Sequence, residues 1–223
     1  MNDFRILIVE DDDDARQQLV ALFREVFPNA RIDAAGTVEE GLKLIRDAVG
    51  RKEPYDIAIL DFKLPRSQGE NPEVDESLCM EIRDSMRKTI VGHITGFPND
   101  EIVKSHVERI HPFTDPRGFF IDKKGEKNWT TDLLDKTTRY LYTIRIEAQM
   151  EQLFGRAGTT ATPAGEFARF GASGPGVSLT TSIASLCSDI GQSWKYLDDT
   201  AKHRIATQFS VNESSEPPFV VLK

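Results

Sequence analysis

The fold of this chain is decided by residues 5–14, which read RILIVEDDDD. An apolar run of strand length leads directly into five carboxylates, whose like charges repel and raise each other's pKa. A second apolar run at residues 57–60, IAIL, also ends on a carboxylate, Asp61. Carboxylate oxygens are the ligands that Mg²⁺ prefers. The two strand ends therefore predict one cation site that includes Glu10, Asp11 and Asp61.

The composition limits the class of protein. The 223 residues are 39% hydrophobic and 29% charged, which is typical of a globular chain long enough to bury a core. A formal net charge of −8 disfavours a broad nucleic-acid or anionic-membrane surface. We expect no signal peptide and no membrane span, because charges interrupt the N-terminus and no apolar run is long enough. Cys79 and Cys187 stand far apart, outside any metal-binding spacing, which favours a reducing cytoplasm.

Strand-like and helix-like segments alternate along the first half of the chain. The expected strands are 4–9, 30–34, 55–60, 90–94 and 119–121, and the expected helices between them are 12–27, 37–50, 76–87 and 99–110. This alternation predicts a doubly wound α/β fold with five parallel strands and right-handed crossovers. Ligands bind such sheets at the carboxyl ends of the strands. Thr95 and Lys123 stand at two of these ends, beside the acids.

Two of the expected helices have recognisable starts. Asp12, Asp13 and Asp14 are interpreted as helix-start charges, because acidic residues suit the positive end of the helix dipole. Thr37 and Glu40 fit a capping box. The side chains expected to face the sheet from the second helix are Val38, Leu42, Ile45 and Val49.

Four segments resemble the receiver domain of two-component response regulators, the CheY-like, flavodoxin-like fold with strand order 2-1-3-4-5. They are ILIVEDD at 6–12, YDIAILDFKLP at 55–65, the pair Thr95-Gly96, and FIDK at 120–123. The resemblance covers roughly residues 1–140. It implies a phosphorylation-operated switch, with no enzymatic activity beyond phosphorylation and autodephosphorylation of its own aspartate.

The resemblance also implies roles for the acids. Asp61 would be the phosphoacceptor that attacks the phosphorus of a phosphohistidine. Asp11 and Asp61 would bind Mg²⁺ directly, with the backbone carbonyl of Lys63 as a third ligand and Glu10 acting through water. A carboxylate attacks an anionic phosphorus only when the developing charge is neutralised, as Mg²⁺ and an ammonium can do. The product is an aspartyl phosphate.

Three further residues take roles from the resemblance. Thr95 would hydrogen-bond one phosphoryl oxygen and Lys123 would pair with another. We choose Lys123 over Lys124 because of its spacing from Phe120. Phe120 would be the aromatic side chain that moves on activation. Phenylalanine stands where the family often has tyrosine, so its ring cannot donate a hydrogen bond.

The chain departs from the family pattern in two connections. Residues 66–76 and 96–118 are both longer than usual, and they flank the side of the fold that signals in the family. They are candidate partner surfaces, although long loops are also where insertions cost least. Lys63, two residues after Asp61, is a candidate for altering the lifetime of the phosphoryl group.

A long helix is expected to begin at Trp129 and to run past the end of a receiver domain, over 141–154. It carries two apolar stripes on different faces. The first consists of Leu133, Thr137, Tyr140, Leu141, Ile144 and Ala148, and the second of Tyr142, Ile146, Met150 and Leu153. One stripe suits the sheet, and the other needs a partner, either a second copy of the chain or the C-terminal segment.

The C-terminal part resembles no known family. Residues 155–178 are rich in Gly, Thr, Ala and Ser and predict a linker. In 179–223 we expect a small helical appendage, with helical spacing from Leu179 to Leu197 and a possible continuation to Phe209. The apolar tail 217–223 suits a sheet edge or a groove.

Several functions remain open at this stage. The leading hypothesis is a response regulator, phosphorylated by a histidine kinase or phosphotransfer protein, that switches protein–protein contacts and possibly forms a homodimer. The alternatives are a DNA-binding transcription regulator and a receiver that regulates an enzyme in trans. Beyond Phe154 the chain has six basic and six acidic residues, so nucleic acid is an unfavoured partner. The sequence predicts Mg²⁺ as the cofactor.

Overall fold

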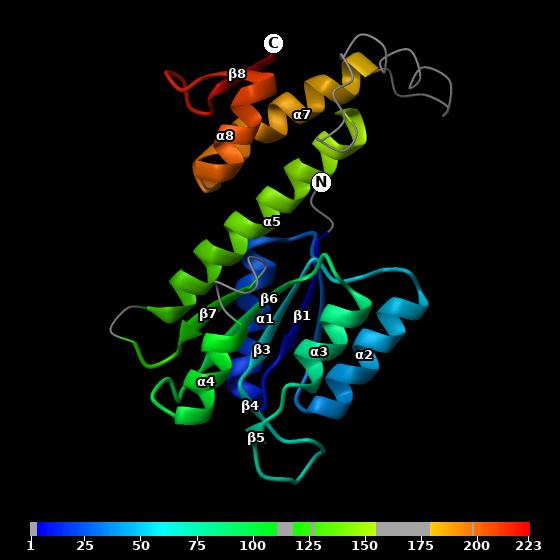
Figure 1. Ribbon diagram of the computed structural model, residues 1–223, viewed down its shortest axis with the longest axis vertical. Coiled ribbons are helices and arrows are strands. Elements are labelled where there is room, and N and C mark those ends of the chain that lie inside the picture. Colours follow the sequence, from blue (N-terminus) through cyan, green and yellow to red (C-terminus); the bar gives the residue numbers. More distant parts are fainter. Residues whose placement is uncertain (1–3, 111–117, 126–127, 155–178, 198) are drawn as a thin grey trace. The chain divides into compact units, whose positions relative to one another are not determined.

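The computed structural model describes residues 4–110, 118–125, 128–154, 179–197 and 199–223. It divides into two compact units, Met1–Thr137 and Thr138–Lys223 (Figure 1). Helix α5 (Trp129–Phe154) is one continuous helix that contributes residues to both units. The predicted linker 155–178 lies outside the described residues, as does part of the predicted 96–118 insertion.

The first unit is built on a five-stranded parallel sheet with the order β2-β1-β3-β6-β7. The strands are β1 Arg5–Val9, β2 Arg31–Ala35, β3 Ile57–Asp61, β6 Ile90–Thr95 and β7 Gly118–Asp122. The helices that alternate with them are α1 Asp13–Val26, α2 Val38–Gly50, α3 Ser77–Ser85 and α4 Glu101–Ile110. The predicted doubly wound, flavodoxin-like fold is confirmed.

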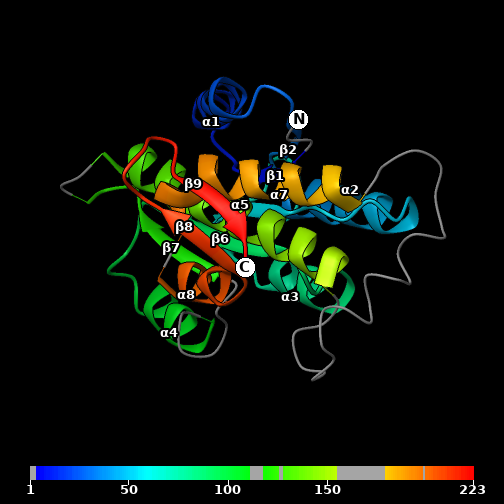
Figure 2. The same cartoon turned by 90° about the horizontal axis from the view of Figure 1, so that it is seen from above.

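Both faces of this sheet are covered. On one face, Leu7, Leu60 and Val91 share a buried core with side chains of α2 and α3, such as Ile45 and Ile82. The residues that alternate with them along the strands are equally buried: Ile6, Ile8, Ile57 and Ile59 are all 0% exposed. Figure 2 shows α1 on the opposite side of the sheet from α3 and α4. Near-continuous apolar strands are what a sheet buried on both faces requires.

The first two helices begin as the sequence predicts. The Asp12 side chain caps α1 by accepting from the Ala15 N–H at 2.9 Å. Thr37 Oγ1 accepts from the Glu40 N–H at 3.2 Å, and the Glu40 carboxylate reaches back to the N–H of Gly36 rather than that of Thr37. One prediction on α2 is wrong: Val49 is 40% exposed. Its neighbour Ala48 is buried instead, so the apolar stripe ends one residue earlier.

The predicted insertion after β3 contains a small hairpin. Strand β4 (Lys63–Leu64) pairs antiparallel with β5 (Glu73–Val74). The hairpin is tied to α2, because the first two amides of that helix donate to the carbonyls of Pro65 and Arg66 at 3.0 and 3.1 Å. The first amides of a helix have no partner within the helix. The hairpin therefore supplies hydrogen-bond acceptors for the first amides of α2, and these bonds hold the hairpin against the helix.

The second unit combines helices with a β-hairpin. Its elements after α5 are helix α7 Leu179–Ser193, the 3₁₀ turn η1 Trp194–Tyr196, helix α8 Asp199–Gln208, and strands β8 Phe209–Asn212 and β9 Phe219–Leu222. The continuous helix to Phe209 is wrong, because η1 interrupts it and Phe209 opens a strand. The apolar tail pairs with β8 as an antiparallel strand, which agrees with the sheet edge that the sequence suggested for it.

The second stripe of α5 is covered within the chain. Ile146 and Met150 belong to one buried cluster with side chains of α7 and α8, among them Ile190 and Ile205. Of the two partners left open for this stripe, the structure shows the C-terminal segment. The described side chains therefore give this stripe no need of a second copy. Leu153, the last member of the stripe, has a side chain outside those described.

A search of the described helices for a membrane-spanning segment found none that is both long enough and apolar enough.

Candidate functional site

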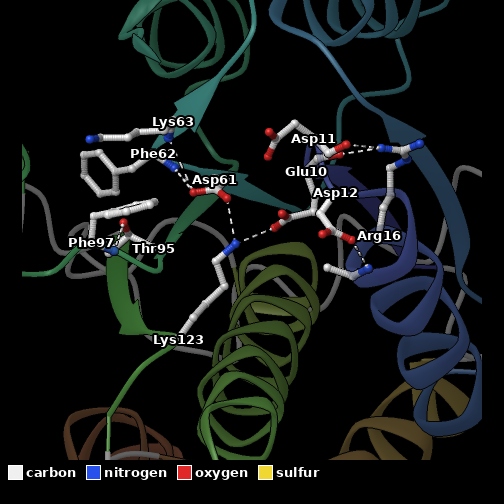
Figure 3. A network of polar contacts seen from close by, with 11 residues as sticks. Glu10, Asp11, Asp12, Arg16, Asp61, Phe62, Lys63, Thr95, Phe97 and Lys123 are labelled. Carbon is white, nitrogen blue, oxygen red and sulfur yellow. Dashed lines mark hydrogen bonds and ion pairs between the residues drawn. The ribbon is translucent and has the colours of Figure 1, made fainter. Parts of the chain in front are cut away.

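The predicted acids meet at the carboxyl end of the sheet. Strands β1 and β3 are parallel neighbours, with Val9 opposite Leu60, so Glu10 and Asp61 follow at adjacent strand ends. Glu10, Asp11 and Asp61 each offer a carboxylate oxygen, and these oxygens all lie within 4.8 Å of one another (Figure 3). Glu10 is 2% exposed and Asp61 is 9% exposed. The register of two buried strands thus holds three acids in one place.

One ammonium group lies between these acids. Lys123, directly after β7, places its Nζ 2.6 Å from Asp61 Oδ2 and 2.8 Å from Glu10 Oε2 (Figure 3). Its backbone N–H donates to the carbonyl of Thr95 at 2.7 Å, which fixes the start of the side chain. The structure therefore brings Lys123 to the acids, whereas Lys124 is exposed and lies elsewhere on the rim.

The clustering shifts the titration of the site. Burial, and next the charge of Asp61, raise the pKa of Glu10 to about 7, although Lys123 opposes the shift. The same two causes raise the pKa of Asp11. Burial alone would lower the pKa of Lys123, but the carboxylates of Asp61 and Glu10 outweigh it and raise that pKa. One lysine does not neutralise three acids, so the group retains an affinity for another cation.

Backbone amides grip the other oxygen of Asp61. Its Oδ1 accepts from the Phe62 N–H at 2.6 Å and from the Lys63 N–H at 3.4 Å. Oδ2 is held by Lys123, so both carboxylate oxygens are fixed and the carboxylate has one orientation. The sharp bend after β3 that creates these contacts begins at Phe62.

Thr95 ends strand β6 on the same rim and is completely buried. Its Oγ1 accepts from the Phe97 N–H at 3.0 Å, which shapes the β6–α4 connection. Phe97 is 51% exposed, an unusual position for a large apolar ring. Thr95 was predicted as a site residue from the sequence. Phe97 was not, because an isolated phenylalanine in a loop gives no periodic signal.

Two lysines lie on the Phe97 ring. Lys63 Nζ is 4.6 Å and Lys124 Nζ is 4.5 Å from the ring centroid, within the range of cation–π attraction. Lys63 also forms an ion pair with Asp100, at 2.7 Å from its Oδ2. In Figure 3 the Lys63 side chain extends toward Phe97 and away from the carboxylate of Asp61. Lys63, predicted to overhang the site, is thus engaged by the β6–α4 connection.

The predicted switch aromatic touches the residue that follows the phosphoacceptor candidate. The ring of Phe120 lies 6.0 Å from that of Phe62, edge to face. Phe62 also packs on His93 at 4.7 Å between ring centroids. Phe62 is buried, and its N–H binds Asp61. A chain of contacts therefore runs from Asp61 through Phe62 to Phe120, and the sequence analysis did not anticipate its middle member.

Arg16 supports the acidic loop and was also missed. Its guanidinium donates to the backbone carbonyl of Glu10 at 2.6 Å and lies 3.4 Å from that of Asp11. It also forms an ion pair with Asp13, one turn away on α1. Its signal in the sequence is weak, because an arginine three residues after an aspartate on a helix is usually a surface pair.

The donor set fits a hard divalent cation. Three carboxylates from two strand ends supply oxygen ligands. Burial first, and then the charge of Asp61, raise the pKa values of Glu10 and Asp11. Asp11 and Asp61 are placed to bind such an ion, with Glu10 behind them. The amides and Lys123 that fix Asp61 leave its carboxylate facing the rim of the sheet.

Comparison with known proteins gives results only among solved structures. No protein-family model matches the chain, and no curated protein matches it either.

Several of the solved structures that match are described as receiver domains. The N-terminal domain of an uncharacterised protein from Wolinella succinogenes is 27% identical, with 65% of this chain and 98% of that chain covered and a TM-score of 0.46. A CheY-like response regulator receiver domain protein from Methanospirillum hungatei is 23% identical, with the same coverage and a TM-score of 0.48. A chain of the CheX–CheY–BeF₃–Mg²⁺ complex from Borrelia burgdorferi is 20% identical, with 60% of this chain and 87% of that chain covered and a TM-score of 0.43.

The strand order β2-β1-β3-β6-β7 in the first unit is that of the flavodoxin-like fold that the sequence motifs indicated. The match to the Methanospirillum hungatei domain covers 65% of the chain, so about a third of the chain lies outside it.

Proposed function

We propose that this chain is a response regulator in which a phosphoryl group is transferred from a phosphohistidine to Asp61, in a reaction that depends on Mg²⁺. The observation that carries the proposal is the meeting of Glu10, Asp11 and Asp61 with Lys123, whose Nζ lies 2.6 Å from Asp61 Oδ2. A purely structural ion pair has no use for three carboxylates and one ammonium. A site that holds a metal and a phosphoryl group requires both signs of charge.

The residues divide the chemistry between them. An oxygen of Asp61 forms the bond to phosphorus while the bond from phosphorus to the donor histidine nitrogen breaks. Lys123, already on Asp61, neutralises charge on the phosphoryl oxygens, and Thr95 offers its hydroxyl from the next strand end. The amides of Phe62 and Lys63 hold the carboxylate in one orientation during the attack.

The metal site would be formed by Asp11, Asp61 and the backbone carbonyl of Lys63, with Glu10 acting through water. When bound, Mg²⁺ supplies charge neutralisation for the anionic phosphoryl group. Arg16 keeps the acidic loop in place through the carbonyls of Glu10 and Asp11.

The output is proposed to be a change in protein–protein contacts. Phosphorylation would act through the contact between Phe62 and Phe120 and through the loop that begins at Thr95. The balanced charge of the sequence beyond Phe154 supports a protein partner rather than nucleic acid. The phosphoryl donor would be a histidine kinase or phosphotransfer protein in the cytoplasm. The free thiols of Cys79 and Cys187 agree with that reducing compartment.

The experiment is binding of beryllofluoride, a phosphoryl mimic, observed by fluorine NMR on the full chain. We expect a bound signal with Mg²⁺ that disappears on removal of Mg²⁺ with EDTA and in Asp61→Asn. The matched control is Asp122→Asn, which changes an acid on the same rim whose Oδ1 accepts from the Lys124 N–H at 2.7 Å, a bond that an amide oxygen retains. Equal binding by Asp61→Asn would refute the proposal.

A further inference from the structure

Lys63 contacts two carboxylates, one through its backbone and one through its side chain. Its backbone N–H lies 3.4 Å from Asp61 Oδ1. Its ammonium is 2.7 Å from Oδ2 of Asp100, the last residue of the β6–α4 connection. The side chains of both partners are 26% exposed, so the pair is accessible to water and inexpensive to break.

Asp100 is itself fixed by the helix that follows it. Its Oδ1 accepts from the Ile102 N–H at 2.9 Å, one residue inside α4, while Oδ2 binds Lys63. The hydrogen bonds from Lys63 and from the helix amides lower the pKa of Asp100. Asp100 thus remains charged and remains in place, whereas the flexible four-carbon stem of lysine is free to follow a new charge.

The Phe97 ring contacts both Lys63 and a second lysine, Lys124. Lys63 and Lys124 lie at nearly equal distances from the ring centroid, 4.6 and 4.5 Å. The two ammonium groups repel each other, and Asp100 is the carboxylate that offsets this repulsion for Lys63. A dianionic phosphoryl group on Asp61 would be a stronger attractor than a single exposed carboxylate.

We propose that Asp100 and the phosphoryl group on Asp61 compete for the ammonium of Lys63. This inference rests on the proposed function of Asp61. With Asp61 unmodified, the ion pair joins the Asp61 loop to the first turn of α4 across Phe97. With Asp61 phosphorylated, Lys63 turns to the phosphoryl oxygens and the connection between the two loops opens. Asp100 is a positioning residue that opposes formation of the phosphorylated state.

The test is a double-mutant cycle on the affinity for beryllofluoride at saturating Mg²⁺. Asp100→Asn removes the competing charge and keeps an oxygen for the Ile102 N–H, so α4 keeps its cap. We expect this variant to bind beryllofluoride about two- to fivefold more tightly, the range of an exposed ion pair. Lys63→Gln should bind less tightly by a similar factor, and adding Asp100→Asn to it should change nothing.

A matched control separates Lys63 from its neighbour. Lys124→Gln removes the other ammonium from the Phe97 ring and leaves the Asp100 ion pair intact. The effect of Asp100→Asn should persist in this background. Three results would each overturn the proposal. Asp100→Asn could leave the affinity for beryllofluoride unchanged in the wild type, or lose its effect in the Lys124→Gln background. It could also raise the affinity by the same factor in the Lys63→Gln background as in the wild type. Failure of the wild type to bind beryllofluoride at all would instead refute the role of Asp61.

Hydrogen exchange provides a second readout. We expect beryllofluoride to increase exchange at residues 97–102 in the wild type, because the ion pair that joins this segment to Asp61 is lost. In Lys63→Gln exchange should be high already and should change little. An increase of equal size in both proteins would overturn the proposal.

Discussion

Acidic side chains are paired differently at the two ends of the parallel sheet. At the amino end, Arg5 forms ion pairs with Asp33 and Glu53, and its N–H binds Asp56. At the carboxyl end, three clustered acids share the single ammonium of Lys123. The arginine lowers the pKa of Glu53, whereas burial and crowding raise that of Glu10 to about 7. The acids named at the amino end are paired with Arg5, whereas those at the carboxyl end outnumber the ammonium that lies among them.

Removal of Lys123 should change the stability of the protein more than any other substitution at the two ends of the sheet. Lys123→Met leaves Glu10 and Asp61 buried without a counterion, and we expect a loss of about 3 kcal/mol in the free energy of unfolding at pH 8 without Mg²⁺. Urea denaturation measures it, and Mg²⁺ should restore part of the loss because it supplies positive charge. Stability equal to that of the wild type would show that the acids are not crowded.

The pH dependence of stability should differ between the two ends. The folded-state pKa of Glu10, about 7, lies above its ordinary value of 4.5. Its contribution to stability is therefore complete below about pH 4.5 and is lost as the pH rises through 7. We expect the metal-free protein to lose about 2 kcal/mol between pH 5.5 and 8 through Glu10. Urea denaturation at pH 5.5 and 8 measures the loss.

Two controls isolate that pH effect. Glu10→Gln should remove this part of the pH dependence, since it has no proton to release. Glu53 should change the stability in the opposite direction with pH. Because its pKa is lowered, its contribution to stability is present above pH 4.5 and is lost as the pH falls. An unchanged pH profile in Glu10→Gln would contradict the assignment.

A smaller effect is expected from Arg16, which contacts no ligand oxygen of the proposed metal site. Arg16→Ala frees the carbonyls of Glu10 and Asp11, so the acidic loop loses its support. We expect Mg²⁺ affinity, measured by calorimetry, to fall by about tenfold while all three carboxylates remain. Arg24, which is exposed on the same helix, gives the matched control Arg24→Ala. Equal affinities in the two variants would remove Arg16 from the site.

The smallest effect is expected at the amino end. Glu53→Gln breaks an exposed ion pair with Arg5, and such pairs contribute little to stability. Both Mg²⁺ affinity and beryllofluoride binding should match those of the wild type in the same assays. A change in either binding measurement would show that the two ends of the sheet are coupled and would contradict their independence.

The strand-end residues were predictable because the pattern that reveals them is local. A buried parallel strand is a short apolar run, and its carboxyl end is the next residue, so Glu10, Asp61 and Thr95 could be placed together without a structure. Lys123 required a choice between neighbours, and the structure pairs Lys123 with the acids. The doubly wound fold followed from the same runs, and the strand order followed from the resemblance to receiver domains.

The contacts between loops could not be predicted in this way. The ion pair between Lys63 and Asp100 joins residues 37 positions apart, and neither belongs to a periodic pattern. The break at Trp194 is similar: helical spacing continues through it, but the chain tightens into a 3₁₀ turn, and helix α8 and the β8–β9 hairpin follow. Tertiary packing of the second unit, rather than local propensity, decides that geometry.

The central claim is that the crowded acids accept a phosphoryl group on Asp61. The most direct measurement is intact-mass spectrometry of the full chain after incubation with a small acyl phosphate donor, with Mg²⁺ or with EDTA. The account predicts one added phosphoryl group with Mg²⁺ only, located on the peptide that contains Asp61 and absent from Asp61→Asn. A phosphoryl group that appears equally in Asp61→Asn, or no phosphoryl group although Mg²⁺ binds, would contradict it.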